Sequence, residues 1–457
     1  MGVNIIHVPQ AQPDGTTFSS IFGEMITPEQ LDKVCQSHAP QTRTSPKLTA
    51  AQVVTGLVYH QLQPSGSLAK NARSLHETGM SDSAFSQRRQ GLPLCLFEQI
   101  AAAALRPMAD PVAHPEAFYQ GLRLVGVDGT QCSVSNTSAL MAALPKAASR
   151  RLTAAFAKLQ VVTLMELCLH NPLAVVAAPA STGEVTLAKK LWASVADQSL
   201  LIIDRGFGTP AGLHEATQSW AGRRVEWLAR VRKNLKTRIL ERLSDGSALV
   251  EAVVKSTDKL GKRTKRVELR MREIRFVVVG RDGKRSEVRL WTSLIDHQQY
   301  PALELAQNYA KRWEHEVAYR ELKLDVRSAV LLNSHTLETA LQEVMAVVLA
   351  MAAITRVRMA AGERLGVPTL RVSFLKILQL TQQLWQSFAW VQAQRSPSLA
   401  ATLCQHYFEE VQRRALLPQR RARSCPRVRR QPVSPWPRKT NQPTFSGPVS
   451  LSIVNLP

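Results

Sequence analysis

Two short apolar runs, each followed directly by an aspartate, decide the fold class. They stand in LVGVDGT at residues 124–130 and in SLLIIDRGF at residues 199–207. Apolar runs of this length predict buried strands of an α/β core. Asp128 and Asp204 are therefore expected where strands end, with Gly129 and Gly206 letting the backbone turn away. Carboxylates at such strand ends face the crevice in which ligands lie. Either aspartate alone would more simply cap a turn, so the inference needs a third element.

Residues 308–325, NYAKRWEHEVAYRELKLD, supply that element as a helix with a polar face. With about 100° between successive residues, four side chains share one stripe about 60° wide: Tyr309, Arg312, Glu316 and Lys323. Glu314 and Glu321 fall on the other side. A stripe of this composition is not an apolar core face. It is either a solvated face with a salt bridge or a place where one acid and two cations meet a phosphate and a metal ion.

Three carboxylates beside cations suit metal-dependent phosphoryl transfer. Two divalent ions about 4 Å apart can activate an attacking oxygen and stabilise the leaving oxygen. Mg²⁺ prefers hard oxygen ligands and keeps several waters, so few carboxylates suffice. Lys and Arg can neutralise the charge that builds on the phosphate. The sequence has no GxSxG and no GxxxxGK[ST] segment, which disfavours a serine hydrolase and predicts no nucleotide cofactor.

The charge balance indicates a polyanionic partner. The 457 residues include 58 Lys and Arg against 35 Asp and Glu, a formal net charge of +23. Residues 411–457 carry many arginines and no acidic residue. Each Lys or Arg docked on a phosphate releases counterions, which favours nucleic acid over a merely solvated basic surface.

Other compositional features exclude several classes of protein. Six widely spaced cysteines without a CxxC pair predict neither a disulfide scaffold nor a zinc knuckle. No secretory signal and no uninterrupted apolar run of about 18 residues is evident. We therefore expect a cytoplasmic protein with no membrane partner.

The first 115 residues predict a helical region that binds the DNA end. Helices are expected over 28–35, 48–61, 67–76 and 81–90, the last two joined by a turn in which Gly79 is left-handed. Ser81 is a suitable N-cap for the fourth helix, SDSAFSQRRQ. Arg88 and Arg89 of this helix are of the type that meets phosphates and base edges, which makes it a candidate recognition helix. The alternative is a small helical bundle with a polar surface.

Strand and helix patterns divide the rest of the chain. An α/β core is expected at 116–222 and 298–365, with a helix over 184–195 and another over 301–326. A β-rich insertion is expected at 223–297, where Val, Leu, Ile and Arg alternate between turn signals. C-terminal helices follow at 366–415, and then a basic tail rich in Pro and Arg at 416–457.

Together these motifs resemble those of the DDE transposases of bacterial insertion sequences, in particular the "insertion sequence four" family. The resemblance rests on DGT at Asp128, DRGF at Asp204 and the Tyr-x2-Arg-x3-Glu-x6-Lys signature with Trp313 after the Arg, and covers about residues 120–360. It implies an RNase H-like core with the β-rich insertion before the last catalytic helix. It also implies a catalytic and metal-binding triad of Asp128, Asp204 and Glu316 for two Mg²⁺ or Mn²⁺ ions.

The same resemblance implies the activity and the partners. Tyr309, Arg312 and Lys323 would contact phosphates of the transposon end. The protein would cleave double-stranded DNA at terminal inverted repeats and transfer the strands, as a homodimer in a synaptic complex on the bacterial nucleoid. Some relatives stack a Trp of the insertion on a flipped base. Trp291 lies three residues after the aligned position, Val288, so its role stays open.

Three alternatives remain at this point. One is a nuclease of the same fold that does not transpose. Another is a catalytically inactive DNA-binding relative, which the intact acids disfavour. The third is an RNA-binding protein, against which the lack of aromatic-rich RNP-type strands counts.

Overall fold

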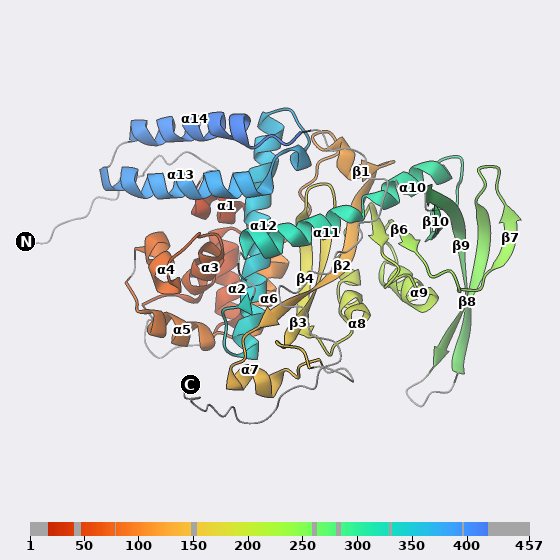
Figure 1. Cartoon of the computed structure of the whole chain (residues 1–457), viewed down its shortest axis with the longest axis horizontal. Helices are drawn as coiled ribbons and strands as arrows, with labels where there is room; N and C mark the ends of the chain where they lie inside the picture. The colour runs from red at the N-terminus through yellow and green to blue at the C-terminus, as the bar shows by residue number, and fades with distance from the viewer. Residues whose placement is uncertain are drawn as a thin grey trace, which may run out of the picture. The chain divides into compact units, whose positions relative to one another are not determined.

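The computed structural model describes residues 17–40, 47–77, 79–147, 153–257, 263–279, 285–327, 329, 331–394 and 397–418. Contacts divide the chain into a main unit, Met1–Phe276 with Glu287–Arg421, and a small one, Val277–Ser286 with Ala422–Pro457. Most of the predicted basic tail lies outside the described residues. All the described helices and the central sheet belong to the main unit, and Figure 1 draws them.

A mixed sheet in the order β4-β3-β2-β5-β6 forms the centre of the α/β part. Its strands are β2 (Leu122–Val134), β3 (Lys158–Glu166), β4 (Asn171–Pro179), β5 (Ser199–Ile203) and β6 (Val225–Arg230). β2, β3 and β4 are antiparallel neighbours, whereas β5 and β6 continue the sheet parallel to β2. The predicted α/β class with an RNase H-like core is confirmed.

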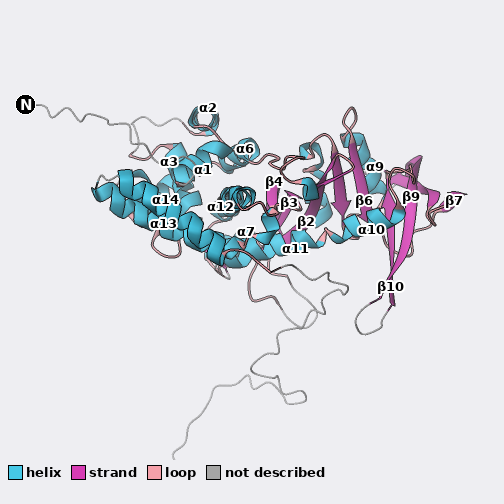
Figure 2. Cartoon of the chain, turned by 90° about the horizontal axis from the view of Figure 1, so that it is seen from above, coloured by secondary structure: helices cyan, strands magenta, loops and turns pink. Residues whose placement is uncertain are grey.

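Both faces of this sheet are covered, which explains the nearly continuous burial of β3 and β5. On one face Val127 and Ile203 pack with Leu187 of α8 (Glu184–Lys189) and Leu213 of α9 (Pro210–Ser219). On the other, Met165 packs with α11 (Trp313–Arg320) and α12 (Leu337–Arg364). Figure 2 shows α11 and α12 beside β2, β3 and β4.

Strand β2 is longer than the sequence predicts. It does not end at Asp128 but pairs with β3 as far as Ser133, and β11 (Leu331–Leu332) joins it in parallel at Ser133 and Val134. Only its pairing with β5 ends early, at Val127 opposite Ile203. The Gly129 that suggested a turn lies inside the strand.

The β-rich insertion extends the same sheet. β10 (Arg285–Thr292) pairs antiparallel with β6, and β9 (Arg263–Val279), β8 (Ala248–Thr257) and β7 (Arg238–Arg242) follow in that order. β6 is thus the fifth strand of the central sheet, so the predicted insertion boundary at 223 is too early. A period of two residues identifies a strand but not the sheet position that it takes.

The helices at the two ends of the chain share one core. The N-terminal helices are α1 (Phe18–Met25), α2 (Pro28–His38), α3 (Ala50–Gln61), α4 (Leu68–His76), α5 (Asp82–Gln90) and α6 (Leu94–Ala104). They pack with α12, α13 (Phe374–Gln394) and α14 (Pro397–Arg414) around side chains such as Phe85, Phe97 and Ile354. The N-terminal region predicted as a separate part is therefore joined to the C-terminal helices through α12 (Figure 1).

Helix α12 is the one helix, among the described residues, that is long and apolar enough to cross a membrane. Most of it is buried against the surrounding helices and the sheet. Its composition is that of a helix at the centre of a protein core. Gln342, Glu343 and Thr355 interrupt its apolar composition, and all three are buried.

Candidate active site

The pairing of β2 with β5 brings the first two acids together. Val127 and Ile203 are the last paired residues, so the next residue on each strand is an aspartate. Neighbouring strands lie about 4.8 Å apart. Asp128 is half-buried, and its Oδ1 accepts a hydrogen bond of 2.8 Å from the Gly129 amide. Among the described residues, no strand pairs with β2 on that side between Val127 and the start of β11 at Ser133, which leaves an open edge in the middle of the sheet.

Arg312 links the second and third acids at this edge. Its Nε lies 3.8 Å from Asp204 Oδ1, and its Nη2 donates to Glu316 Oε1 at 2.9 Å. Tyr309 is buried and donates from its hydroxyl to Asp204 Oδ1 at 3.4 Å. Two members of the predicted stripe, Tyr309 and Arg312, therefore contact Asp204, and Glu316 is linked to it through Arg312.

The helix that carries them is not continuous. α10 (Ala302–Ala310) ends before Lys311 and Arg312, α11 follows, and the segment Glu321–Val326 is a π-helix. A phase of 100° per residue therefore does not apply beyond Arg320. Lys323 is half-buried and lies close enough to Cys132 to act on the pKa of its thiol. The contact of Lys323 with DNA stays a prediction.

Negative charge is crowded at this edge. Burial, followed by the charges of Glu184 and Asp204, raises the pKa of Asp128 to about 7, while the Gly129 amide and Arg312 act in the opposite sense. Burial and then Asp204 raise the pKa of Glu184. Burial lowers the pKa of Arg312, but Asp204 and the other acceptors around it raise it more. The guanidinium is thus the cation that balances these carboxylates.

The donor set fits a divalent cation of the Mg²⁺ type, because carboxylates are its preferred protein ligands. In the described part of the chain, however, no three acidic, His or Cys side chains lie close enough to hold one ion together. Arg312 stands between Asp204 and Glu316 instead. Convergence of the three acids on a metal therefore requires Arg312 to release at least one of them.

A buried polar cluster ties the helix of Glu316 to the strand of Asp128. The Tyr319 hydroxyl donates to the main-chain oxygen of Asp128 and accepts from the Thr163 amide at 3.2 Å. Thr163 Oγ1 lies 2.9 Å from both the Tyr319 hydroxyl and His315 Nε2. Burial lowers the pKa of His315 to about 3, so the ring is neutral. These residues are not among those predicted from the sequence, although His315 and Tyr319, at i and i+4 on one helix beside Ala318, are a usable signal.

A second buried cluster holds the opposite side of the same helix. His170 is fully buried, with Nε2 3.1 Å from Glu314 Oε2 and Nδ1 2.6 Å from Glu321 Oε2. Arg358 of α12 donates to Glu321 Oε1 at 3.3 Å. Glu314 and Glu321 do lie away from Glu316, as predicted, but they are not solvated positions. Their replacement would disturb the packing of α11, so they are unsuitable as neutral controls.

The N-terminal candidates separate into two kinds. Arg89, predicted to contact DNA, is buried and donates to Gln342 Oε1 at 3.1 Å and to Ser334 Oγ at 3.0 Å. This prediction is wrong, because Arg89 anchors α5 to α12. Arg88 is half-buried and donates to the Leu48 carbonyl at 3.4 Å, and its role in DNA binding stays a prediction.

The turn between α4 and α5 also differs in detail. Ser81 does cap α5, accepting from the Ala84 amide at 3.2 Å. The left-handed residue is Glu77, with φ of 56°, and not Gly79. Asp82 accepts from the Ala69 amide at 2.8 Å and so fixes the two helices to each other. The geometry of the pair is therefore set by side chains at the helix ends.

Trp291 does not have the exposure that base stacking requires. It is fully buried, and its Nε1 donates to Glu273 Oε2 at 2.8 Å. Arg289 donates to the same oxygen. The residue therefore stabilises the insertion from within.

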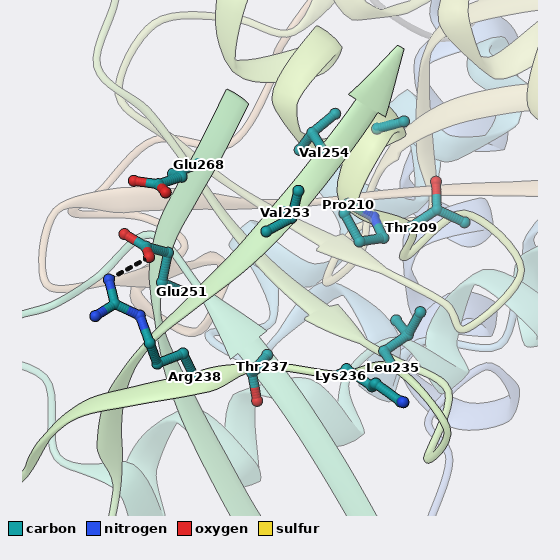
Figure 3. Close-up of a pocket in the computed structure, with 11 residues that line it drawn as sticks. Thr209, Pro210, Leu235, Lys236, Thr237, Arg238, Glu251, Val253, Val254 and Glu268 are labelled. Carbon is teal, nitrogen blue, oxygen red and sulfur yellow. Dashed lines mark hydrogen bonds and ion pairs between the residues drawn. The ribbon is translucent and has the colours of Figure 1, made fainter. Parts of the chain in front are cut away.

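A pocket of about 710 Å³ lies between the start of α9 and the insertion strands. Its lining includes Thr209, Lys236 and Val253. Figure 3 shows Arg238 at its side, paired with Glu251 at 2.6 Å. None of the three acids lines it, so the pocket is distinct from the acidic edge.

Carboxylates at an open sheet edge, with an arginine and a tyrosine from one helix, define a site for chemistry on phosphates within an RNase H-like core. Residues 121–353 match the family described as Transposase DDE domain. The chain belongs to this family and is a DNA transposase. The resemblance inferred from the motifs is confirmed, and a nuclease or an inactive relative is not favoured.

Two individual proteins are also similar. The chain is 24% identical over 445 residues to "Transposase InsG for insertion sequence element IS4" from Escherichia coli (strain K12). This match covers 94% of this chain and 97% of that protein. A cryo-EM structure of the piggyBac transposase synaptic complex with hairpin DNA aligns with a TM-score of 0.43 and 9% identity. That alignment covers 89% of this chain and 87% of the other.

Proposed function

We propose that this transposase cuts double-stranded DNA at the terminal inverted repeats of an IS4-type insertion sequence and joins the freed ends to target DNA. The observation that carries the proposal is the meeting of Asp204 and Glu316 on Arg312, one strand away from Asp128. The similarity to InsG along nearly the whole chain supports the type of element.

Asp128, Asp204 and Glu316 would together hold two Mg²⁺ or Mn²⁺ ions. Burial, followed by the charges of Glu184 and Asp204, raises the pKa of Asp128, and a bound cation would offset this cost of ionising the carboxyl. Bound ions would supply activation of the attacking oxygen and stabilisation of the leaving oxygen. The protein's own contribution would be to present the three side chains from the ends of two paired strands and from a helix braced by Tyr319.

Arg312 would exchange its carboxylate partners for a phosphate of the transposon end. A guanidinium can hold a phosphate with two parallel hydrogen bonds. Tyr309, which contacts Asp204 from the same helix, would bind beside it. Lys323, in the π-helical segment that follows α11, would contact a phosphate as a point charge.

End recognition would fall to α5, whose exposed Ser83, Ser86 and Gln87 lie on the same helix as Arg88. We expect a homodimer that synapses two ends, acting on DNA in the bacterial cytoplasm. The basic C-terminal residues would add sequence-independent affinity for phosphates.

The test is single-turnover cleavage of labelled DNA carrying an element end, with nicked, hairpin and joined products measured separately. Asp128→Asn, Asp204→Asn and Glu316→Gln should abolish cleavage in Mg²⁺ but retain the gel shift, because binding depends mostly on Lys and Arg. Glu29→Gln, at an exposed acid, is the matched control. Substantial cleavage by any of the three would remove that residue from the site. Nicking without hairpin or joined products would indicate a nuclease instead.

A further inference from the structure

A fourth carboxylate lies beside Asp128. Glu184 is the first residue of α8, on the side of the sheet opposite to α11. A Cβ added to Gly129 would stand 1.8 Å from Glu184 Oε1 and 2.5 Å from its carboxyl carbon. The carboxylate of Glu184 therefore occupies the space that any side chain at position 129 would need.

Gly129 consequently has an acid on two sides. Its amide donates to Asp128 Oδ1 at 2.8 Å, while Glu184 Oε1 lies over its Cα. Successive side chains of a strand point to opposite faces, so Asp128 and Glu184 approach from different faces. Both lie at the part of β2 that β5 no longer covers, because the pairing of β2 with β5 ends at Val127.

Glu184 is held in this position by a buried side chain. Gln160 of β3 is 6% exposed, and its Nε2 donates to Glu184 Oε1 at 3.4 Å and to the Thr130 carbonyl at 3.2 Å. Gln131, directly across the β2–β3 pairing, donates to Gln160 Oε1 at 3.2 Å. The amide of Gln160 is therefore fixed, and it directs one oxygen of Glu184 while leaving the other available.

A structural role for Glu184 as a helix-terminal acid does not account for this arrangement. An acid in the first turn gains from the helix dipole while fully solvated, as Glu29 does at the start of α2. Glu184 is instead half-buried among other acids, which costs free energy without a cation. The lack of a side chain at position 129 then has a specific explanation, because only glycine leaves room there for the Glu184 carboxylate.

We propose that Glu184 is a fourth metal-binding carboxylate of the active site, positioned by Gln160 and admitted by Gly129. The proposal rests on the metal-dependent function proposed above and adds to it a ligand from α8. The four acids would then surround the open edge from both faces of the sheet, with Arg312 as the resident cation when no divalent ion is bound.

The test measures Mn²⁺ affinity of the full-length protein by calorimetry, and its unfolding temperature in EDTA and in Mn²⁺. Glu184→Gln should weaken Mn²⁺ binding about tenfold or more. In EDTA it should unfold at the wild-type temperature or above, because a repulsive charge is removed. Glu29→Gln should leave both quantities unchanged.

Gly129→Ala provides a second, independent variant. Its methyl group displaces the Glu184 carboxylate, so it should reproduce the loss of Mn²⁺ affinity, and the double variant should lose no more than either single one. Wild-type affinity in Glu184→Gln would overturn the proposal, as would a lower unfolding temperature in EDTA at unchanged affinity. Asp128→Asn distinguishes failure of the proposed metal site from failure of the proposed role of Glu184. If both Asp128→Asn and Glu184→Gln bind Mn²⁺ with wild-type affinity, the metal site itself is refuted. If Asp128→Asn loses affinity and Glu184→Gln does not, only the role of Glu184 is refuted.

Discussion

Replacing Tyr319 by Phe tests how the helix of Glu316 is fixed to the strand of Asp128. The hydroxyl bridges the Thr163 amide and the Asp128 carbonyl inside the protein. The Thr163 amide and the Asp128 carbonyl also face each other in the β2–β3 pairing and keep that partner. The loss is therefore that of the two hydrogen bonds of the hydroxyl, at about 0.5–1.5 kcal/mol each, which predicts about 1–3 kcal/mol in the free energy of unfolding. Thr163 Oγ1 keeps His315 as a partner and should add little. Cleavage should fall more than DNA binding, since Glu316 loses its support.

Urea unfolding of the full-length protein measures this loss of stability, as a shift of the unfolding midpoint when the dependence of the free energy on urea concentration is unchanged. Tyr407→Phe is a matched control, because Tyr407 is also buried and lies 3.2 Å from a threonine hydroxyl, that of Thr381, but far from the acids in the fold. It should cost about 0.5–1.5 kcal/mol and leave cleavage unchanged. Equal unfolding midpoints for the two variants, with normal cleavage by Tyr319→Phe, would refute the argument.

Three further predictions follow from the buried and exposed cations. Burial acts to lower the pKa of His170, but the adjacent Glu321 and Glu314 carboxylates raise it above its ordinary 6.5. The stabilising contribution of His170 should therefore be complete below about pH 6.5 and be lost as the pH rises through the pKa of the folded state. His170→Gln should abolish this pH dependence of the urea unfolding midpoint. Arg89→Met should destabilise the protein by about 2 kcal/mol without changing its preference for end DNA. Arg88→Ala should weaken binding to end DNA at normal stability. Gel shifts in which Arg89→Met, and not Arg88→Ala, weakens binding to end DNA would contradict a purely structural role for the buried Arg89. Arg312→Ala and Lys323→Ala should retain Mn²⁺ binding and lose hairpin and joined products more than nicks, because later steps depend on positioning a freed end; a wild-type product distribution would exclude both from the DNA contact.

Much of the site follows from local patterns in the sequence. Apolar runs locate β2 and β5, and the residue directly after each run is an aspartate, Asp128 or Asp204. The parallel register then places these two residues side by side. Tyr309, Arg312 and Glu316 are close in sequence, so their shared face survives the break after α10. The capping of α5 by Ser81 is likewise local.

Other features depend on contacts between distant segments and were out of reach. Arg89 has the composition of a DNA contact, and only the packing of α5 on Gln342 of α12 makes it a buried anchor. The chain becomes π-helical at Glu321, just before Lys323, and no residue type announces this change. Glu184 is unremarkable in sequence, and its place beside Gly129 appears only when α8 is laid on the sheet.

The most direct test of the central claim is a crystal structure of the full-length protein with end DNA and Mn²⁺, located by anomalous scattering. We predict Mn²⁺ at the open edge between β2 and β5, bound by Asp128, Asp204 and Glu316, with Arg312 moved from the acids to a DNA phosphate. Arg312 still bridging Asp204 and Glu316, with Mn²⁺ elsewhere on the protein, would contradict the account.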